Sequence, residues 1–411
     1  MSHSVAAIHP KRAASYRLPA LLAALAALVL PAVASAQGTK VYDPGASDTE
    51  IKIGQTYPYS GPLSSASDMA LTQAAYFKMI NDEGGINGRK IAFMSLDDTY
   101  SPPKAVEQTR RLVERDEVLL IFNSFGSPTS AAVQKYLNGK KIPQLFASTG
   151  GARFTEPGFP WSSSALPNYV DAGRMIGSYI TTRLKNTKVA VLFQNDDFGK
   201  DYMKGIKEAF AREPSVQIVA ESSYEPAQPT VDSQIATLAN SGATVFVNIT
   251  TGRSTVQSIR TLASLDWKPT HILNGQWADI SSVFKPAGLK NSAGIITTRY
   301  IKAPDDPAWA DDKAIREYKD FMAKHRPGSD ANSKFNIQGY FYAQVLIHIL
   351  KEAGNALTRE NINAIAMNLT RQRFDVLIPS VTITTTPEQR NLIHDEVFVR
   401  FDGEKFVPIE Q

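Results

Sequence analysis

The hydroxyl side chains of Ser127 and Thr129 stand where an apolar segment gives way to a helix-like stretch, in "LLIFNSFGSPTSAAV" at residues 119–133. The first turn of a helix presents free backbone N–H groups and the positive end of the helix dipole, and both attract an anion. This segment holds no lysine or arginine and lacks the GxxxxGK[ST] spacing of a phosphate-binding loop. A carboxylate therefore suits the loop better than a phosphate, which usually recruits a basic residue as well.

A second hydroxyl-rich loop follows the next apolar segment, where Ser148 and Thr149 open "STGGARF". Serine and threonine also cap helices without any ligand, so one such loop alone indicates little. Ligands of open parallel sheets bind at the carboxyl ends of the strands, where neighbouring loops lie side by side. Two such loops at neighbouring strand ends therefore favour a ligand site.

Aromatic side chains lie at or near the same strand ends. They are Tyr57, Tyr59, Phe125, Phe198, Trp277 and Tyr300. We expect some of them to contact the ligand and the others to belong to the core or the rim. Basic residues are nearly absent from these loops, with Arg153 as the exception.

The elements that would position these loops alternate along the chain. Apolar runs predict strands that begin near residues 51, 91, 118, 142, 188, 243, 270 and 293, and amphipathic stretches predict helices at 66–80, 102–114 and 128–140. Gly84 or Gly85 is expected to close the first helix in the left-handed conformation. The strands are continuous apolar runs, which is typical of a parallel sheet covered by helices on both faces. We therefore predict an α/β fold with two doubly wound parallel-sheet lobes.

The first 36 residues have the pattern of a secretory signal peptide. A basic region with Lys11, Arg12 and Arg17 precedes an apolar run at 18–34, and "ASA" offers a cleavage site at Ala36. The apolar run is near the lower length limit for a membrane span, so we expect cleavage and a periplasmic protein. The segment carries no acidic residue, so the formal net charge of +4 falls when it is removed and gives no reason to expect nucleic acid binding.

The composition excludes several other classes of protein. The chain has no cysteine, so it has no disulfide framework, no thiolate nucleophile and no cysteine-based zinc site. Its 6 histidines are scattered without metal-binding spacing, and we expect no metal and no cofactor. No GxSxG motif is present and no histidine lies near the hydroxyl-rich loops, so we expect that the protein is not an enzyme. Asp97 and Asp98 are expected to end a strand and cap the following helix.

Five motifs in order carry a resemblance that covers about residues 48–411. They are "IKIGQTYPYSGP", "NDEGGINGRKI", "DDTYSPPKAVEQTRRLVE", "NSFGSPTSAAV" and "NDDFGKDY". Together they resemble the leucine/isoleucine/valine-binding family of periplasmic substrate-binding proteins, which serve ABC importers. The resemblance implies a ligand cleft between two lobes joined by three crossovers, near residues 165–168, 296–299 and 380–387. Lobe 1 would comprise residues 48–166 plus 298–382, and lobe 2 would comprise 167–297 plus 383–411.

The resemblance also implies roles for individual residues. Ser127 falls on the serine that binds the ligand carboxylate, and Ser148 to Gly151 fall on a small residue and a threonine of the site. Phe198 replaces a tyrosine, while Gln276 and Asn168 stand where the family has acidic residues. The complete set of candidate ligand-binding residues is Tyr57, Ser127, Thr129, Ser148, Thr149, Gly150, Gly151, Asn168, Phe198, Gln276 and Trp277.

The half of the site that would hold an amino group is altered. A buried ammonium needs a paired charge, and neither Gln276 nor Asn168 supplies one. Asp196, Asp197 or Asp279 could substitute, although each also fits a role in a turn or a helix cap. An aromatic or aliphatic carboxylic acid therefore fits these features at least as well as leucine does.

We therefore expect a monomeric, exported substrate-binding protein that captures a small carboxylate and delivers it to the membrane permease of an ABC importer. A soluble ligand-binding partner of a membrane sensor is the alternative. A transcription regulator of the same fold would need a DNA-binding helix pair at the N-terminus, where the export signal lies instead.

Overall fold

The computed structural model describes residues 40–409, so the predicted signal peptide and its cleavage site lie outside the described residues. Two sheets organise this part of the chain. The first has the strand order β3-β2-β4-β5-β6, and all its neighbouring strands are parallel. Its strands are β2 (Glu50–Tyr57), β3 (Lys90–Asp97), β4 (Leu120–Phe122), β5 (Gln144–Ala147) and β6 (Ser162–Ser164).

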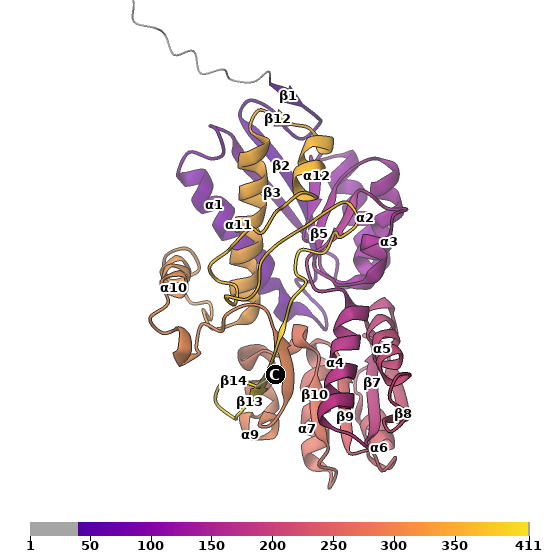
Figure 1. Ribbon diagram of the computed structural model, residues 1–411. Helices are drawn as coiled ribbons and strands as arrows, with labels where there is room; N and C mark the ends of the chain where they lie inside the picture. Colours follow the sequence, from indigo (N-terminus) through magenta and orange to yellow (C-terminus); the bar gives the residue numbers. More distant parts are fainter. Residues whose placement is uncertain (1–39, 410–411) are drawn as a thin grey trace, which may run out of the picture. The chain divides into compact units, whose positions relative to one another are not determined.

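Helices cover both faces of the first sheet (Figure 1). They are α1 (Ser67–Asp82), α2 (Pro102–Glu114), α3 (Ser127–Gly139) and α11 (Lys334–Ala353), while α10 (Lys313–His325) packs beside α1 and α12 (Arg359–Ala366) packs on α11. The helix α2 has the bounds that its sequence predicts, with Pro102 and Pro103 in the first turn. The chain closes α1 through Gly84 and Gly85, both at positive φ, as expected.

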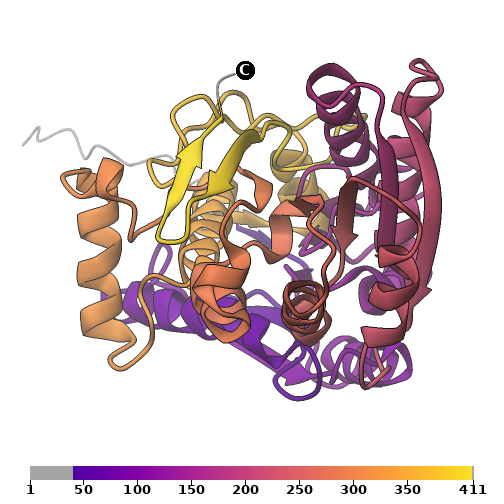
Figure 2. The same cartoon turned by 90° about the horizontal axis from the view of Figure 1, so that it is seen from below.

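The second sheet has the strand order β14-β13-β11-β10-β9-β7-β8. Its strands are β7 (Lys188–Gln194), β8 (Gln217–Tyr224), β9 (Val245–Ile249), β10 (Thr270–Leu273), β11 (Ile296–Arg299), β13 (Val397–Phe401) and β14 (Phe406–Pro408). The five strands β7 to β11 form a parallel sheet, of which the sequence predicted β7, β9, β10 and β11 but not β8. At one edge, β13 of the hairpin β13–β14 (yellow in Figure 2) pairs antiparallel with β11. This hairpin was not predicted from the sequence.

Four helices accompany the strands β7 to β10. They are α4 (Tyr169–Arg183), α5 (Asp197–Phe210), α6 (Asp232–Ala239) and α7 (Gly252–Ser264). The pairs α4–α5 and α6–α7 each pack together, in agreement with a doubly wound arrangement. After β10 the chain forms a 3-10 turn at Gly275–Trp277, a π-helical turn at Ile280–Phe284, and the short helices α8 (Lys285–Ala287) and α9 (Leu289–Ser292).

Three connections link the two sheets. The chain leaves the first sheet between β6 and α4, returns to it after β11, and enters the second sheet again with β13. The Leu392 N–H still donates to the Ser164 carbonyl of β6 (N···O 2.8 Å), so the last connection begins after Leu392, further along than residues 380–387. The residue boundaries of the two lobes remain a prediction.

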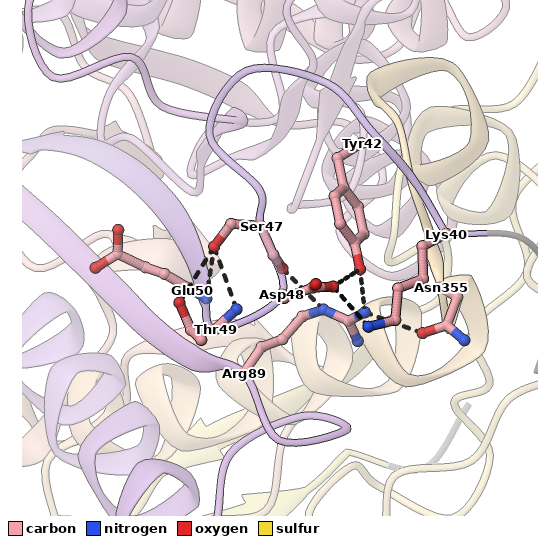
Figure 3. A network of polar contacts seen from close by, with 8 residues as sticks. All are labelled: Lys40, Tyr42, Ser47, Asp48, Thr49, Glu50, Arg89 and Asn355. Atoms are coloured by element: carbon pink, nitrogen blue, oxygen red, sulfur yellow. Dashed lines mark hydrogen bonds and ion pairs between the residues drawn. The ribbon is translucent and has the colours of Figure 1, made fainter.

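A polar network fixes the first described residues to the first sheet's elements (Figure 3). The short strand β1 (Val41–Tyr42) pairs with β12 (Ala356–Leu357). The buried Arg89 guanidinium donates to the Ser47 carbonyl and to Asn355 Oδ1, both at 2.9 Å. The network therefore anchors the chain just after the expected cleavage site. Within residues 40–409, none of the helices combines the length and hydropathy that a membrane span requires.

Candidate functional site

The structure brings the two hydroxyl-rich loops together at the N-terminus of α3. The Gly126 N–H donates to the Ser148 carbonyl (N···O 3.2 Å), which joins the loop after β4 to the loop after β5. The hydroxyl oxygens of Ser127 and Thr149 are 2.7 Å apart, and both side chains are buried. The sequence-based expectation that these loops converge is therefore correct.

Two further hydroxyl groups of the predicted set share a weak acceptor. The Tyr57 hydroxyl donates to the sulfur of Met69 at 3.0 Å, and the Ser148 hydroxyl lies 3.9 Å from the same sulfur. A thioether is a poor hydrogen-bond acceptor, so a ligand oxygen would be a better partner for both groups. Burial raises the pKa of Tyr57 well above its usual range, so the phenol stays neutral and remains a donor.

Other predicted residues shape the backbone of these loops. The Thr129 hydroxyl donates to the carbonyls of Phe125 and Gly126, so its proton serves the turn that begins α3. A Cβ at Gly150 would lie 1.9 Å from the Pro167 carbonyl oxygen, which only glycine permits. The chain at Gly151 is less constrained, because a Cβ there would lie 3.3 Å from the nearest atoms, on the ring of Phe154.

An aromatic wall connects elements of the two sheets. The ring of Phe125 lies 5.2 Å from Tyr57 and 6.4 Å from Trp277, measured between centroids. Trp277 follows β10 of the second sheet, whereas Phe125 and Tyr57 belong to the first. Phe198 packs separately, 5.0 Å from the ring of Tyr169. The wall places large apolar surface beside the four hydroxyl groups.

The residues at the predicted ammonium end have different partners. The Asn168 carboxamide oxygen accepts from the Val170 N–H (2.9 Å) and caps α4, so its acceptor is already used. Gln276 is buried, and its Nε2 has no hydrogen-bond partner among residues 40–409. Gln276 therefore holds a buried side-chain donor without a partner among the described residues, whereas the carboxamide oxygen of Asn168 serves as a helix cap.

The three aspartates that could replace an acidic residue have structural roles. Asp196 accepts from the Gly199 N–H and caps α5, and Asp279 accepts from the Ser282 N–H at 2.6 Å. Asp197 forms an ion pair with Arg153 (3.0 Å). Their interpretation as turn and capping residues is confirmed for Asp196 and Asp279.

Asp97 and Asp98 hold the turn after β3. Asp97 Oδ1 accepts from the Tyr59 and Thr99 N–H groups, and Asp98 Oδ1 accepts from the Tyr100 N–H. The residue at the N-cap of α2 is Ser101, so the prediction that the aspartates cap this helix is wrong. The aspartates instead stabilise two residues, Thr99 and Tyr100, at positive φ.

Sequence reasoning missed a buried chain of amides behind the loops. Gln55 Nε2 donates to Gln73 Oε1 (2.7 Å), Gln73 Nε2 donates to Asn123 Oδ1 (2.7 Å), and Asn123 Nδ2 donates to the Phe146 carbonyl (2.8 Å). These bonds join β2, α1 and the ends of β4 and β5, so they fix the two loops relative to each other. The three amides are scattered through apolar segments, and no local pattern marks them as partners.

A buried lysine was also missed. Lys334, the first residue of α11, donates from Nζ to the carbonyls of Gly275 and Gln276, the second at 3.3 Å. Burial lowers the pKa of Lys334 to about 7, and the charge of Arg299 acts in the same direction. The side chain thus supports the turn that carries Gln276 and Trp277. No group of His, Cys, Asp or Glu that could hold a metal ion occurs within the described part of the chain.

Comparison with known proteins agrees with this geometry. A family model described as "Periplasmic binding protein" matches residues 50–405. The Leu/Ile/Val-binding protein homolog 7 of Brucella abortus (strain 2308) is 26% identical over 233 residues, which cover 54% of this chain and 58% of that relative. The match thus spans somewhat more than half of the relative's length.

Solved structures share the fold at low identity. A branched chain amino acid ABC transporter from Thermus thermophilus with bound valine has a TM-score of 0.79 at 16% identity, over 89% of this chain and 97% of that chain. A fatty acid ABC transporter substrate-binding protein from Thermomonospora curvata has a TM-score of 0.73 at 21% identity, over 90% and 94%. These likenesses establish an α/β fold of two lobes. Because the family model covers most of the chain, this protein belongs to the periplasmic binding protein family.

Proposed function

We propose that this protein is the exported substrate-binding component of an ABC-type importer and that it captures a small carboxylate. The observation that carries the proposal is the group of four hydroxyls, from Tyr57, Ser127, Ser148 and Thr149, at the N-terminus of α3. Two of them, Tyr57 and Ser148, point to the sulfur of Met69, which is a weak acceptor. A carboxylate would accept from hydroxyl groups and from the free N–H groups of the first helical turn without a basic residue.

The other end of the ligand is an aromatic or aliphatic body. The wall of Tyr57, Phe125 and Trp277 supports this choice, because such rings stabilise an apolar group by burial. Asn168, Asp196 and Asp279 already accept hydrogen bonds from backbone N–H groups. The neutral amide of Gln276 suits a keto or hydroxyl oxygen. Branched-chain amino acids remain within the class, as the names of the relatives suggest.

Capture would proceed by closure of the two lobes, with hinge motion at the three connections between the sheets. We propose that the protein works as a monomer in the periplasm after cleavage near Ala36, and that it hands its ligand to a membrane permease. No catalytic step and no cofactor belong to this function.

A thermal-shift screen followed by calorimetric titration tests the proposal. The panel contains leucine, valine, 4-methyl-2-oxopentanoate, benzoate, phenylacetate and hexanoate, with glucose and inorganic phosphate as non-carboxylate controls. Binding raises the melting temperature by mass action, so at least one carboxylate should raise it and the two controls should not. Binding of glucose or phosphate without binding of any carboxylate would refute the proposal.

A further inference from the structure

Tyr100 reaches from the first sheet's elements to the second. Its hydroxyl oxygen accepts from Gln194 Nε2 (3.2 Å) at the end of β7, and its ring lies 6.2 Å from that of Phe125 in the aromatic wall. Gln194 is held in place because its Oε1 accepts from the hydroxyls of Tyr224 and Thr251. The phenol therefore docks on a fixed partner across the two sheets.

The position of the Tyr100 ring is enforced from two sides. Tyr100 and Thr99 both have positive φ, at 61° and 53°, and the Asp98 and Asp97 carboxylates accept their N–H groups at 2.8 and 2.9 Å. On the other side, a Cβ at Gly126 would lie 2.4 Å from the Tyr100 ring. Backbone strain of this kind persists only where the surroundings determine it, and it is concentrated at functional positions.

Tyr100 also lines a pocket of about 420 Å³. This volume falls within the range of small-molecule sites, roughly 300–1,000 Å³. Four prolines line it, together with Tyr100 and the acidic residues Asp196 and Glu225. The prolines are Pro62, Pro102, Pro128 and Pro226. Pro128 directly follows Ser127, so the pocket begins one residue from the hydroxyl pair that we assign to the carboxylate.

We propose that Tyr100 sets the length of the acid that the site accepts, by closing the site against this proline-lined pocket. The proposal rests on the proposed carboxylate function and adds its length limit. Without the Tyr100 ring, the site and the pocket become continuous. The apolar tail of a longer monocarboxylic acid then lies in the proline-lined pocket. A second carboxylate is disfavoured there, because Asp196 and Glu225 border the same space.

Titration calorimetry with butanoate, hexanoate, octanoate, decanoate and octanedioate tests this on the wild type and on Tyr100→Ala, Tyr100→Gly and Tyr100→Phe. The glycine variant also accommodates the positive φ, so it secures the test if the alanine variant does not fold. In the ring-deleted variants, the affinity for octanoate relative to butanoate should rise by about tenfold or more. Burial of two of the four additional methylene groups of octanoate predicts a change of this size. Tyr100→Phe keeps the ring and should keep the wild-type ratio, and octanedioate should gain nothing.

Each contrary result has its own meaning. An unchanged ratio in folded Tyr100→Ala and Tyr100→Gly, or an equal loss for all chain lengths, would overturn the length limit alone. A shift in Tyr100→Phe as large as in Tyr100→Ala would assign the effect to the Gln194 hydrogen bond and would also overturn it. If the wild type binds none of these acids and none of the carboxylates of the screening panel, the proposed function fails and the length limit fails with it.

Discussion

The side-chain ammonium of Lys334 donates a hydrogen bond to the backbone carbonyl of Gln276, with Nζ and the oxygen 3.3 Å apart. Lys334 begins α11, which packs closely on α1, since a Cβ at Gly339 would lie 2.4 Å from the Met69 carbonyl. Gln276 belongs to the turn after β10 of the second sheet. The Lys334 N–H also donates to Asp279 (2.7 Å). One residue thus ties the helix on the first sheet to the turn that carries two predicted ligand residues.

Replacement of this lysine by methionine should weaken ligand binding. In Lys334→Met, the carbonyls of Gly275 and Gln276 lose a buried hydrogen-bond donor. Burial raises the pKa of Glu396, and this carboxyl also loses the nearby positive charge that acts to lower its pKa. We expect a loss of roughly 1–3 kcal/mol in binding free energy, the typical cost of unpaired buried groups. Calorimetric titration measures it, and Lys351→Met, at an exposed position of the same helix, is the control.

The same variant should change the pH dependence of stability. Lys334 has a pKa near 7 in the folded protein and an ordinary value of 10.5, so between these pH values the unfolded chain binds a proton that the folded chain does not. The free energy of unfolding of the wild type should therefore rise with pH from about 7 toward 10 through this group. Urea unfolding at pH 7.5 and 9.5 should show a smaller rise in Lys334→Met. An equal rise in both proteins would contradict a role for this charge.

Ser127→Ala should weaken binding of the ligand identified by the screen. We expect a loss of roughly 1–3 kcal/mol in binding free energy, because a hydrogen bond to a charged group is removed. The melting temperature without ligand should change little. Ser130→Ala is the matched control, since Ser130 is a buried serine of the same helix whose hydroxyl donates to the Ser124 carbonyl (3.3 Å). Equal affinity losses in both variants would show that the effect comes from the helix and not from a ligand contact.

The helix α2 and the Asp196 cap of α5 show what the sequence reveals by itself. Proline in the first turn, and aspartate just before a helix, act within a few residues of the chain. The strand β8 was not predicted, because its exposed and partly buried positions alternate along an edge and give no continuous apolar run. Local patterns therefore predict the parallel core better than the sheet edges.

The convergence of Ser127 and Thr149 followed from topology, since loops after neighbouring parallel strands lie side by side. The contact between Lys334 and Gln276 joins residues 58 positions apart, and nothing near either residue indicates the other. The role of Tyr100 likewise depends on Gln194, which is 94 positions away. Contacts of this kind depend on how the two sheets pack, which a single sequence does not specify.

Asp98→Asn should stabilise the protein at neutral pH. Burial raises the pKa of Asp98 to about 6 from an ordinary value of 3.8, and its Oδ2 has no hydrogen-bond partner among residues 40–409. The folded state therefore disfavours the charged form, and stability falls as pH rises from about 4 to 6. An asparagine can keep the acceptor for the Tyr100 N–H, so we expect a gain of about 1–3 kcal/mol at pH 7.5 that disappears near pH 4. Chemical unfolding across this pH range measures it.

Asp97→Asn is the control for this prediction, and its effect on stability should have the opposite sign. Burial acts to raise the pKa of Asp97, but hydrogen bonds from Ser60 and Thr99 hold this pKa below its usual range. The charged form is favoured in the folded state, so this variant should lose stability at pH 7.5. A gain in both variants would mean that any loss of negative charge in the turn stabilises the protein, and the burial argument for Asp98 would be wrong.

A keto acid should compete well with the matching amino acid for the site. An ammonium group loses hydration on burial and needs a nearby carboxylate, but Asp196 and Asp279 cap helical turns and Asp197 pairs with Arg153. The free Nε2 of Gln276 is a donor, which suits a keto oxygen and opposes an ammonium. Calorimetric titration with leucine and 4-methyl-2-oxopentanoate, and with phenylalanine and phenylpyruvate, compares the two classes directly. We expect the two dissociation constants of a pair to lie within about tenfold of each other, which is roughly 1.4 kcal/mol, or the keto acid to bind more tightly. Amino acids that bind more than about a hundredfold tighter would contradict the prediction, and Asp196→Asn and Asp279→Asn would then identify which carboxylate leaves its cap to reach the ammonium.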